Sequence, residues 1–304
     1  MNNQKYKPSS DDIDLKDFLS IAWETKKIFA AIMLSFGIIS VIYSTNLPNL
    51  YTSESLVTIV STDYQSSSSS GGMTSNFSGL ASVAGLNIGM GGGDGRSALA
   101  IATIQSRDFV KHLMGFEGIL PALMASKSFN HGSQEIIFDD TVYDYKNKKW
   151  VEGRPSYLEV HRVYREMLSI NLDRKSGFID MKIEHLSPVF SKFFLDLIIQ
   201  EANNIVRKNE LQESKLSLEY LNEMLLTTKQ IDTKLAITQL IEGELKTQML
   251  ANVRADYLLS PIDEAFLPLY KSNPARLRIL VMWLLSGLAI YFLGLLVKLM
   301  ISRD

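Results

Sequence analysis

Residues 279–297 form the uncharged run ILVMWLLSGLAIYFLGLLV, which lies between Arg278 and Lys298. At about 1.5 Å of rise per residue, a helix of this length crosses a hydrocarbon core roughly 30 Å thick. A second run, IFAAIMLSFGIISVIYSTNL, occupies residues 28–47 near the other end of the chain, and no charge occurs between Lys27 and Glu54. Transmembrane helices are therefore predicted at residues 28–47 and 276–298, rather than buried helices of a soluble core.

A secretory signal peptide is the alternative for the first run. Twenty-seven residues precede that run, several of them acidic, and no small-residue cleavage site follows Tyr43. We therefore expect a retained membrane anchor. Small residues recur every seven positions in both runs, and such spacing allows close helix packing, with chance recurrence as the alternative. These residues are Ala30, Gly37 and Ser44 in the first run, and Gly287 and Gly294 in the second.

The distribution of basic residues predicts the orientation. The tail before the first run carries Lys5, Lys7, Lys16, Lys26 and Lys27, whereas no Lys or Arg follows that run until Arg96. By the positive-inside rule, residues 1–27 and 299–304 are predicted to be cytoplasmic tails, and residues 48–275 an extracytoplasmic domain. Lys271, Arg276 and Arg278 on the outer flank of the second run oppose this orientation. The first run is given more weight because it usually dominates topology.

Residues 89–99, GMGGGDGRSAL, raise the question of a nucleotide site. A phosphate-binding loop requires G-x-x-x-x-G-K-[ST], but Met90 occupies the first glycine position and Arg96 the lysine position. A dinucleotide fingerprint is met only loosely, by Gly93, Gly95 and Ala98, and a Ser/Gly-rich stretch precedes it instead of a strand. A flexible loop that ends at a helix N-terminus near Ser97 is the preferred interpretation, and no cofactor is expected.

The composition excludes several classes of protein. The chain has 31 Lys and Arg against 33 Asp and Glu and no cysteine, so nucleic-acid binding, a disulfide scaffold and thiolate metal sites are not expected. His112, His131, His161 and His185 are far apart in sequence, and no metal or nucleophile motif is present. The acidic pairs Asp139-Asp140 and Asp263-Glu264 have the chemistry for acid–base work on a sugar, but adjacent acids are more often solvated surface. We expect no catalytic residue and no metal.

Between the two apolar runs, the sequence shows both strand patterns and helix patterns. A strand is predicted at residues 51–62, a helix at 97–114 with Ser97 as its N-cap, and an irregular exposed insertion at 135–150. An amphipathic helix follows at residues 156–168. A β-hairpin is then predicted at residues 169–185, with its turn at Lys175-Ser176-Gly177.

Long helices are predicted over about residues 188–258. Ser187-Pro188 supplies an N-cap and a first-turn proline, and a second helical stretch begins near residue 231. Heptad-like spacing relates Leu211, Leu218, Leu221 and Leu225, although Ser214 interrupts it. Two interpretations stay open: one buried stripe on a long helix, or a helix–helix seam, such as one between subunits. Pro261, Pro268 and Pro274 then stiffen the segment before the second run, as a rigid spacer or a partner contact.

Four segments occur in this order along the chain: IDLKDFLSIAWETKKIF, SGLASVAGL with the later SRDFV, DRKSGFIDMKIEHLSP, and IDEAFLPLYKSNPARLRIL. Together they resemble the Wzz-type chain-length determinants, or polysaccharide co-polymerases, in the short form without a fused kinase domain. In the last segment, Asp263, Pro268 and Pro274 match the family's juxtamembrane motif. Tyr270-Lys271 occupies the place of a further proline usual in the family.

The resemblance implies a membrane-anchored α+β protein of the bacterial inner membrane. Two transmembrane helices would flank a periplasmic α/β base domain with a long protruding helical extension. It further implies a homo-oligomer that acts beside an integral-membrane polymerase on O-antigen or a related lipid-linked glycan. Such a protein controls chain length without being an enzyme. Only six residues follow Lys298, so no kinase domain is expected in the same chain, while a separate kinase partner stays open.

Two other classes share the two-span plan: a ligand-gated channel and a membrane-anchored sensor. Familiar channels of this plan have cysteine-rich ectodomains, and neither apolar run here contains an ionisable residue that would mark an ion path. The short tails leave no room for a signalling domain.

Overall fold

The computed structural model describes residues 25–60 and 94–301, and the chain divides into two compact units. One unit joins residues 1–49 to 272–304, and the other comprises residues 50–271. The N-terminal tail up to residue 24 and the Ser/Gly-rich stretch up to Gly93 lie outside the described residues. The chain contains mixed helix and sheet with a long helical extension, between two apolar helices. This arrangement confirms the fold class predicted from sequence.

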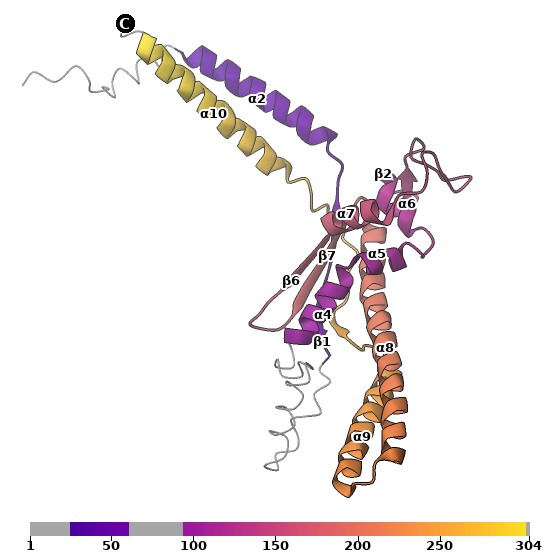
Figure 1. The fold of residues 1–304 in the computed structure, drawn as a ribbon. Helices are drawn as coiled ribbons and strands as arrows, with labels where there is room; N and C mark the ends of the chain where they lie inside the picture. The colour runs from indigo at the N-terminus through magenta and orange to yellow at the C-terminus, as the bar shows by residue number, and fades with distance from the viewer. Residues whose placement is uncertain (1–24, 61–93, 302–304) are drawn as a thin grey trace, which may run out of the picture. The chain divides into compact units, whose positions relative to one another are not determined.

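The first unit is a pair of antiparallel helices, α2 (Lys26–Asn46) and α10 (Arg276–Ile301), which lie side by side in Figure 1. Both are long and apolar enough to cross a membrane. The Thr25 and Tyr291 hydroxyls are 2.8 Å apart, and Phe29 packs edge-on against the same tyrosine. The N-terminal end of α2 thus lies beside the C-terminal part of α10.

A four-stranded antiparallel sheet forms the centre of the second unit, in the order β6-β7-β1-β8. Its strands are β1 (Tyr51–Ile59), β6 (Leu168–Leu172), β7 (Ile179–His185) and β8 (Leu259–Asp263). Burial alternates along β1 and β7, because successive side chains point to opposite faces of the sheet. The predicted strand at residue 51 is confirmed, as is the β6–β7 hairpin, whose turn places Gly177 at φ +75°.

Helix α7 (Tyr157–Met167) packs against β6 and β7, and two shorter helices, α5 (Arg107–Leu113) and α6 (Ile119–Met124), pack against α7. In α7, the Ser156 hydroxyl accepts from the Glu159 N–H, and the Glu159 carboxylate accepts from the Ser156 N–H. This reciprocal cap confirms the amphipathic helix predicted from Ser156.

Two sequence predictions in this unit are wrong. The single helix expected from Ser97 to Met114 is two helices, α4 (Asp94–Ile104) and α5. Ser97 is buried inside α4, and Ser106 caps α5 by accepting a hydrogen bond from the Phe109 N–H. The insertion at residues 135–150 is not irregular. Two small hairpins form there, made by β2 (Ser126–Asn130) with β3 (Glu135–Phe138), and by β4 (Tyr143–Asp144) with β5 (Lys149–Trp150).

The 40-residue helix α8 (Pro188–Thr227) covers the sheet with its first half and then pairs with α9 (Ile231–Val253) beyond the sheet (Figure 1). Ser187 caps α8 as predicted, since its hydroxyl accepts from the Phe190 N–H. The first half of α8 is buried, with Phe194, Leu195 and Ile198 in the core against Val57 of β1 and Met181 of β7. The distal half of α8 is mostly exposed.

Candidate functional site

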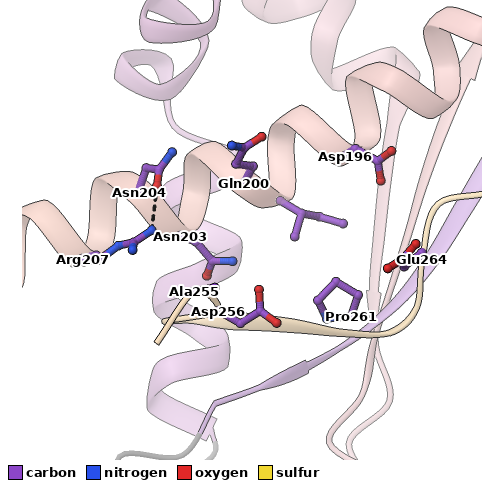
Figure 2. Close-up of a pocket in the computed structure, with 10 residues that line it drawn as sticks. Asp196, Gln200, Asn203, Asn204, Arg207, Ala255, Asp256, Pro261 and Glu264 are labelled. Carbon is purple, nitrogen blue, oxygen red and sulfur yellow. Dashed lines mark hydrogen bonds between the residues drawn. The ribbon is translucent and has the colours of Figure 1, made fainter. Parts of the chain in front are cut away.

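A polar cleft lies between the middle of α8 and β8, the edge strand that leads into the proline-rich juxtamembrane segment. Its volume is about 490 Å³. Figure 2 shows the side chains of α8 on one side of the cleft and those around β8 on the other. The α8 wall consists of Asp196, Ile199, Gln200, Asn203, Asn204 and Arg207; the opposite wall consists of Ala255, Asp256, Pro261 and Glu264.

Asn203 fixes the two walls of this cleft to each other. Its side-chain carbonyl accepts from the N–H groups of Leu258 and Leu259 at 2.8 and 2.7 Å, and its amide donates to the Leu259 carbonyl at 2.8 Å. The side chain is buried, so these bonds satisfy groups that would be costly to leave unpaired. The start of β8 is thereby held against α8.

A chain of polar contacts continues along the α8 wall. The His112 ring nitrogen Nε2 lies 2.6 Å from a carboxylate oxygen of Glu201, and the other oxygen accepts from the Asn204 amide at 2.9 Å. Asn204 in turn accepts from Arg207 at 2.8 Å, the bond drawn in Figure 2. Arg207 also donates to the Arg254 carbonyl at 3.5 Å. The guanidinium is therefore held in one place at the end of the cleft.

The opposite wall passes directly into the juxtamembrane motif. Ser55 and Ser53, both buried on β1, donate to the carbonyls of Asp263 and Phe266 at 2.8 Å each. Asp263 is the last residue of β8, and its side chain is exposed. Beyond Phe266 the segment leaves the sheet, and Leu269 and Tyr270 beside Pro268 are more than four-fifths exposed. Pro274 lies two residues before α10.

A second polar cluster joins Arg96 of α4, at the end of the glycine-rich stretch, to Glu210 of α8 and to Tyr257. Arg96 lies 3.5 Å from the Glu210 carboxylate, donates to the Tyr257 carbonyl at 3.4 Å, and lies over the Tyr257 ring. The Tyr257 hydroxyl donates to Glu210. Burial, and then the hydrogen bond to Glu210, raise the pKa of Tyr257. Arg96, the residue in the lysine position of the rejected phosphate loop, therefore ties α4 to α8.

The chemistry of the cleft is that of a polar contact surface. Within residues 25–60 and 94–301, no three His, Asp or Glu side chains are grouped as a metal site would require. The cleft presents carboxylates, amides and one guanidinium, which together accept and donate hydrogen bonds. Such a set suits a hydroxyl-rich or mixed polar ligand better than an apolar one.

The structure places the predicted helix-packing residues in two groups. Ser44 is buried between α2 and α10, and a Cβ on Gly287 would meet Phe36 at 3.1 Å. Gly37 and Gly294 have open space where a Cβ would be, and Ala30 is exposed. The contact between α2 and α10 thus uses Ser44 and Gly287, while the remaining three stay a prediction for contacts with other helices.

All four leucines of the predicted seam are half-buried in α8, along the side that packs on α9. Ser214, which interrupts their heptad spacing, is buried and donates to the Glu244 carbonyl of α9 at 3.1 Å. The structure therefore pairs this side of α8 with a helix of the same chain.

The sequence interpretation missed the cleft. It had no reason to join residues near 200 to residues near 260, which only the fold brings together. A signal was present, however, in the α8 stretch LDLIIQEANNIV, where Gln200, Glu201, Asn203 and Asn204 interrupt an apolar run. Polar side chains inside a buried helix usually have a partner on another element.

A comparison with family models agrees with the resemblance found in the sequence. Residues 11–114, about a third of the chain, match the family model described as "Wzz: Chain length determinant protein". The resemblance is thereby confirmed for this part of the chain. The comparison with curated proteins finds no match. Among solved structures, the chain is similar to a "full-length bacterial polysaccharide co-polymerase" at 12% identity and a TM-score of 0.39, over 96% of this chain and 99% of that chain.

Proposed function

We propose that this chain, whose residues 11–114 match the Wzz chain-length determinant family, regulates the chain length of a bacterial surface polysaccharide. The family match is the observation that carries the proposal. The order of elements supports it: two apolar helices flank a base domain from which a long α8–α9 hairpin extends. The glycan is O-antigen or a related lipid-linked polymer.

The protein acts in the inner membrane, with α2 and α10 as its two spans and residues 48–275 in the periplasm. The antiparallel contact of the two helices supports this plan, because it brings the start of α2 to the same side as the end of α10. The excess of lysine before α2 supports a cytoplasmic location for those ends.

Its role is non-catalytic. The polymer is extended by a separate integral-membrane polymerase, and this protein forms a homo-oligomeric scaffold beside it. The polar cleft between α8 and β8 is the proposed regulatory contact, because it adjoins both the long helix and the segment that carries Asp263 and Pro268. Its hydrogen-bonding side chains suit a sugar or a polar loop of the polymerase.

The test is the surface-polysaccharide ladder on a gel, with and without the gene in its own host. We expect the deletion strain to keep its polymer and lose the preferred length, and the gene supplied in trans to restore that length. An unchanged ladder for each surface glycan of the host would contradict the proposal. Conductance in reconstituted membranes would then distinguish a channel from an anchored sensor.

A further inference from the structure

Two arginines begin α10, and the proposed function gives them no role. Arg276 and Arg278 lie in the first turn of this helix, which contains no acidic residue. No Asp or Glu occurs in residues 25–53 or 265–303, so both chain segments at this end of the helix pair lack a negative charge. In the orientation proposed above, the arginines also oppose the positive-inside rule. An anionic partner outside the chain would account for both observations.

Neither arginine has a carboxylate partner within the part of the chain that the structure describes, where every ion pair joins other residues. Arg276 Nη2 donates to the side-chain oxygen of Asn49 at 3.2 Å, and Arg278 is exposed. A guanidinium has five N–H donors, so the Asn49 bond leaves Arg276 able to hold a second acceptor. Because the macrodipole adds positive partial charge at the start of a helix, two cations there are unfavourable unless an anion lies close.

Arg278 lies at the height where the hydrocarbon layer ends. It is the last charged residue before the uncharged run at residues 279–297, and Lys298 follows that run. At about 1.5 Å of rise per residue, Arg278 and Lys298 are about 30 Å apart along the helix axis, which is the thickness of a hydrocarbon core. The Cα–Cβ bonds of a helix tilt towards its N-terminus, so both arginine side chains extend out of the hydrocarbon into the headgroup layer.

The two arginines lie on different sides of α10. Positions three, four and seven residues after Arg278 share its side of the helix. They are Val281, Met282 and Leu285, and they are 46%, 64% and 59% exposed. Seven residues after Arg276, Trp283 packs against Phe36 of α2. Arg278 therefore continues the side of α10 that faces lipid, whereas Arg276 lies on the side of α2, where Asn49 orients it.

We infer that Arg276 and Arg278 bind the phosphate groups of anionic phospholipids at the outer boundary of the two spans. The inference rests on the proposed placement of α2 and α10 in the inner membrane, and it names the lipid partner of that placement. A guanidinium matches a phosphate group with two parallel N–H···O bonds, and the acyl chains of the same lipid lie along the apolar side that follows Arg278. The lipid phosphates then supply the negative charge that residues 265–303 lack.

Lipid titration of the purified full-length protein tests this contact. Delipidated protein in a neutral detergent is titrated with phosphatidylglycerol or, separately, with phosphatidylcholine, and native mass spectrometry counts the lipids bound. We expect the wild-type protein to bind phosphatidylglycerol more tightly. Arg278→Gln and Arg276→Gln should each weaken that binding about fivefold, the effect of one basic residue near an anionic membrane surface. Phosphatidylcholine binding should change less, because the choline group offsets the phosphate charge.

Two further variants serve as matched controls. Arg278→Lys keeps the charge and should retain more phosphatidylglycerol binding than Arg278→Gln. Lys215→Gln removes the same charge from an exposed position of α8 and should leave the binding unchanged. Excess inorganic phosphate should not displace the lipid, because it has no acyl chain. Equal affinity of the wild type for the two lipids, an equal loss in Lys215→Gln, or displacement by phosphate would overturn the inference.

The surface-polysaccharide ladder distinguishes a failure of this inference from a failure of the proposed function. If the gene sets the preferred length while its protein shows no lipid preference, the lipid contact is overturned and the function stands. If the arginine variants lose phosphatidylglycerol binding in a protein whose gene leaves every ladder unchanged, the lipid contact stands and the function is contradicted.

Discussion

His185 is buried at the end of β7 and positions the first turn of α8. Its Nε2 lies 3.0 Å from the Ala122 carbonyl, and its Nδ1 accepts from the Ser187 N–H at 3.0 Å. Both bonds are made by a neutral ring, with Nε2 as the donor. Burial lowers the pKa of His185 to about 4. Protonation of this one side chain therefore disturbs the N-terminal end of α8.

We predict that the free energy of unfolding decreases as pH falls through this range. The unfolded chain binds a proton near pH 6.5 and the folded chain only near pH 4, so the contribution is complete above about pH 6.5 and is lost towards pH 4. Its size is on the order of 3 kcal/mol. Denaturant unfolding of the detergent-solubilised protein at several pH values measures it. His185→Asn should flatten the pH dependence, and the exposed His131→Asn should not; a wild-type slope in His185→Asn would contradict the assignment.

At the scale of elements, the juxtamembrane segment joins β8 to α10. Its first part is held by β1 through the Asp263 and Phe266 carbonyls, whereas Leu269 and Tyr270 are exposed. Stiffness in this segment comes from Pro268, which is buried, and Pro274, which is half-buried, because proline fixes φ near −65°.

Replacing Pro268 and Pro274 together with alanine should shorten or broaden the distribution of polysaccharide lengths. Each change loosens the backbone by about 0.4–1 kcal/mol of conformational entropy, and the change at Pro268 also removes part of a buried ring. The readout is the polysaccharide ladder at matched protein level. Leu269→Ala keeps both prolines and serves as the control; a normal ladder in the double variant would refute the role of the prolines.

The contact between α2 and α10 depends on a glycine. A side chain at Gly287 would press on Phe36, whereas Gly294 has open space around it. Gly287→Leu should therefore cost about 1–3 kcal/mol through overpacking, seen as a lower thermal midpoint in detergent. Gly294→Leu is the matched control and should leave the midpoint unchanged. Equal midpoints for both variants would show that this contact does not stabilise the protein.

At the scale of the whole molecule, the orientation across the membrane determines which side the cleft and hairpin face. Single cysteines at Lys5 and Gln212 would test it with a membrane-impermeant maleimide on intact spheroplasts. Gln212→Cys should label at once, and Lys5→Cys only after the membrane is permeabilised. The reverse pattern would place the hairpin in the cytoplasm and exclude the proposed site of action.

The sequence by itself determined the elements whose stability is local. The apolar runs of α2 and α10, the Ser187-Pro188 start of α8 and the Gly177 turn depend on residues close in the chain, so composition and spacing predict them. The family resemblance follows from the same local segments and their order. The Asp263, Pro268 and Pro274 motif was found in this way, although its role stays a prediction.

Only the tertiary structure decided the remaining features, because the contacts that stabilise them join residues distant in sequence. The strand β8 contains Pro261 and is stable as an edge strand, where Asn203 and β1 supply its contacts. The cleft and the ties of Arg96 are likewise invisible without the fold. The structure also assigned the leucines of α8 to α9 and left other apolar side chains of both helices exposed, because two helices bury only one side of each.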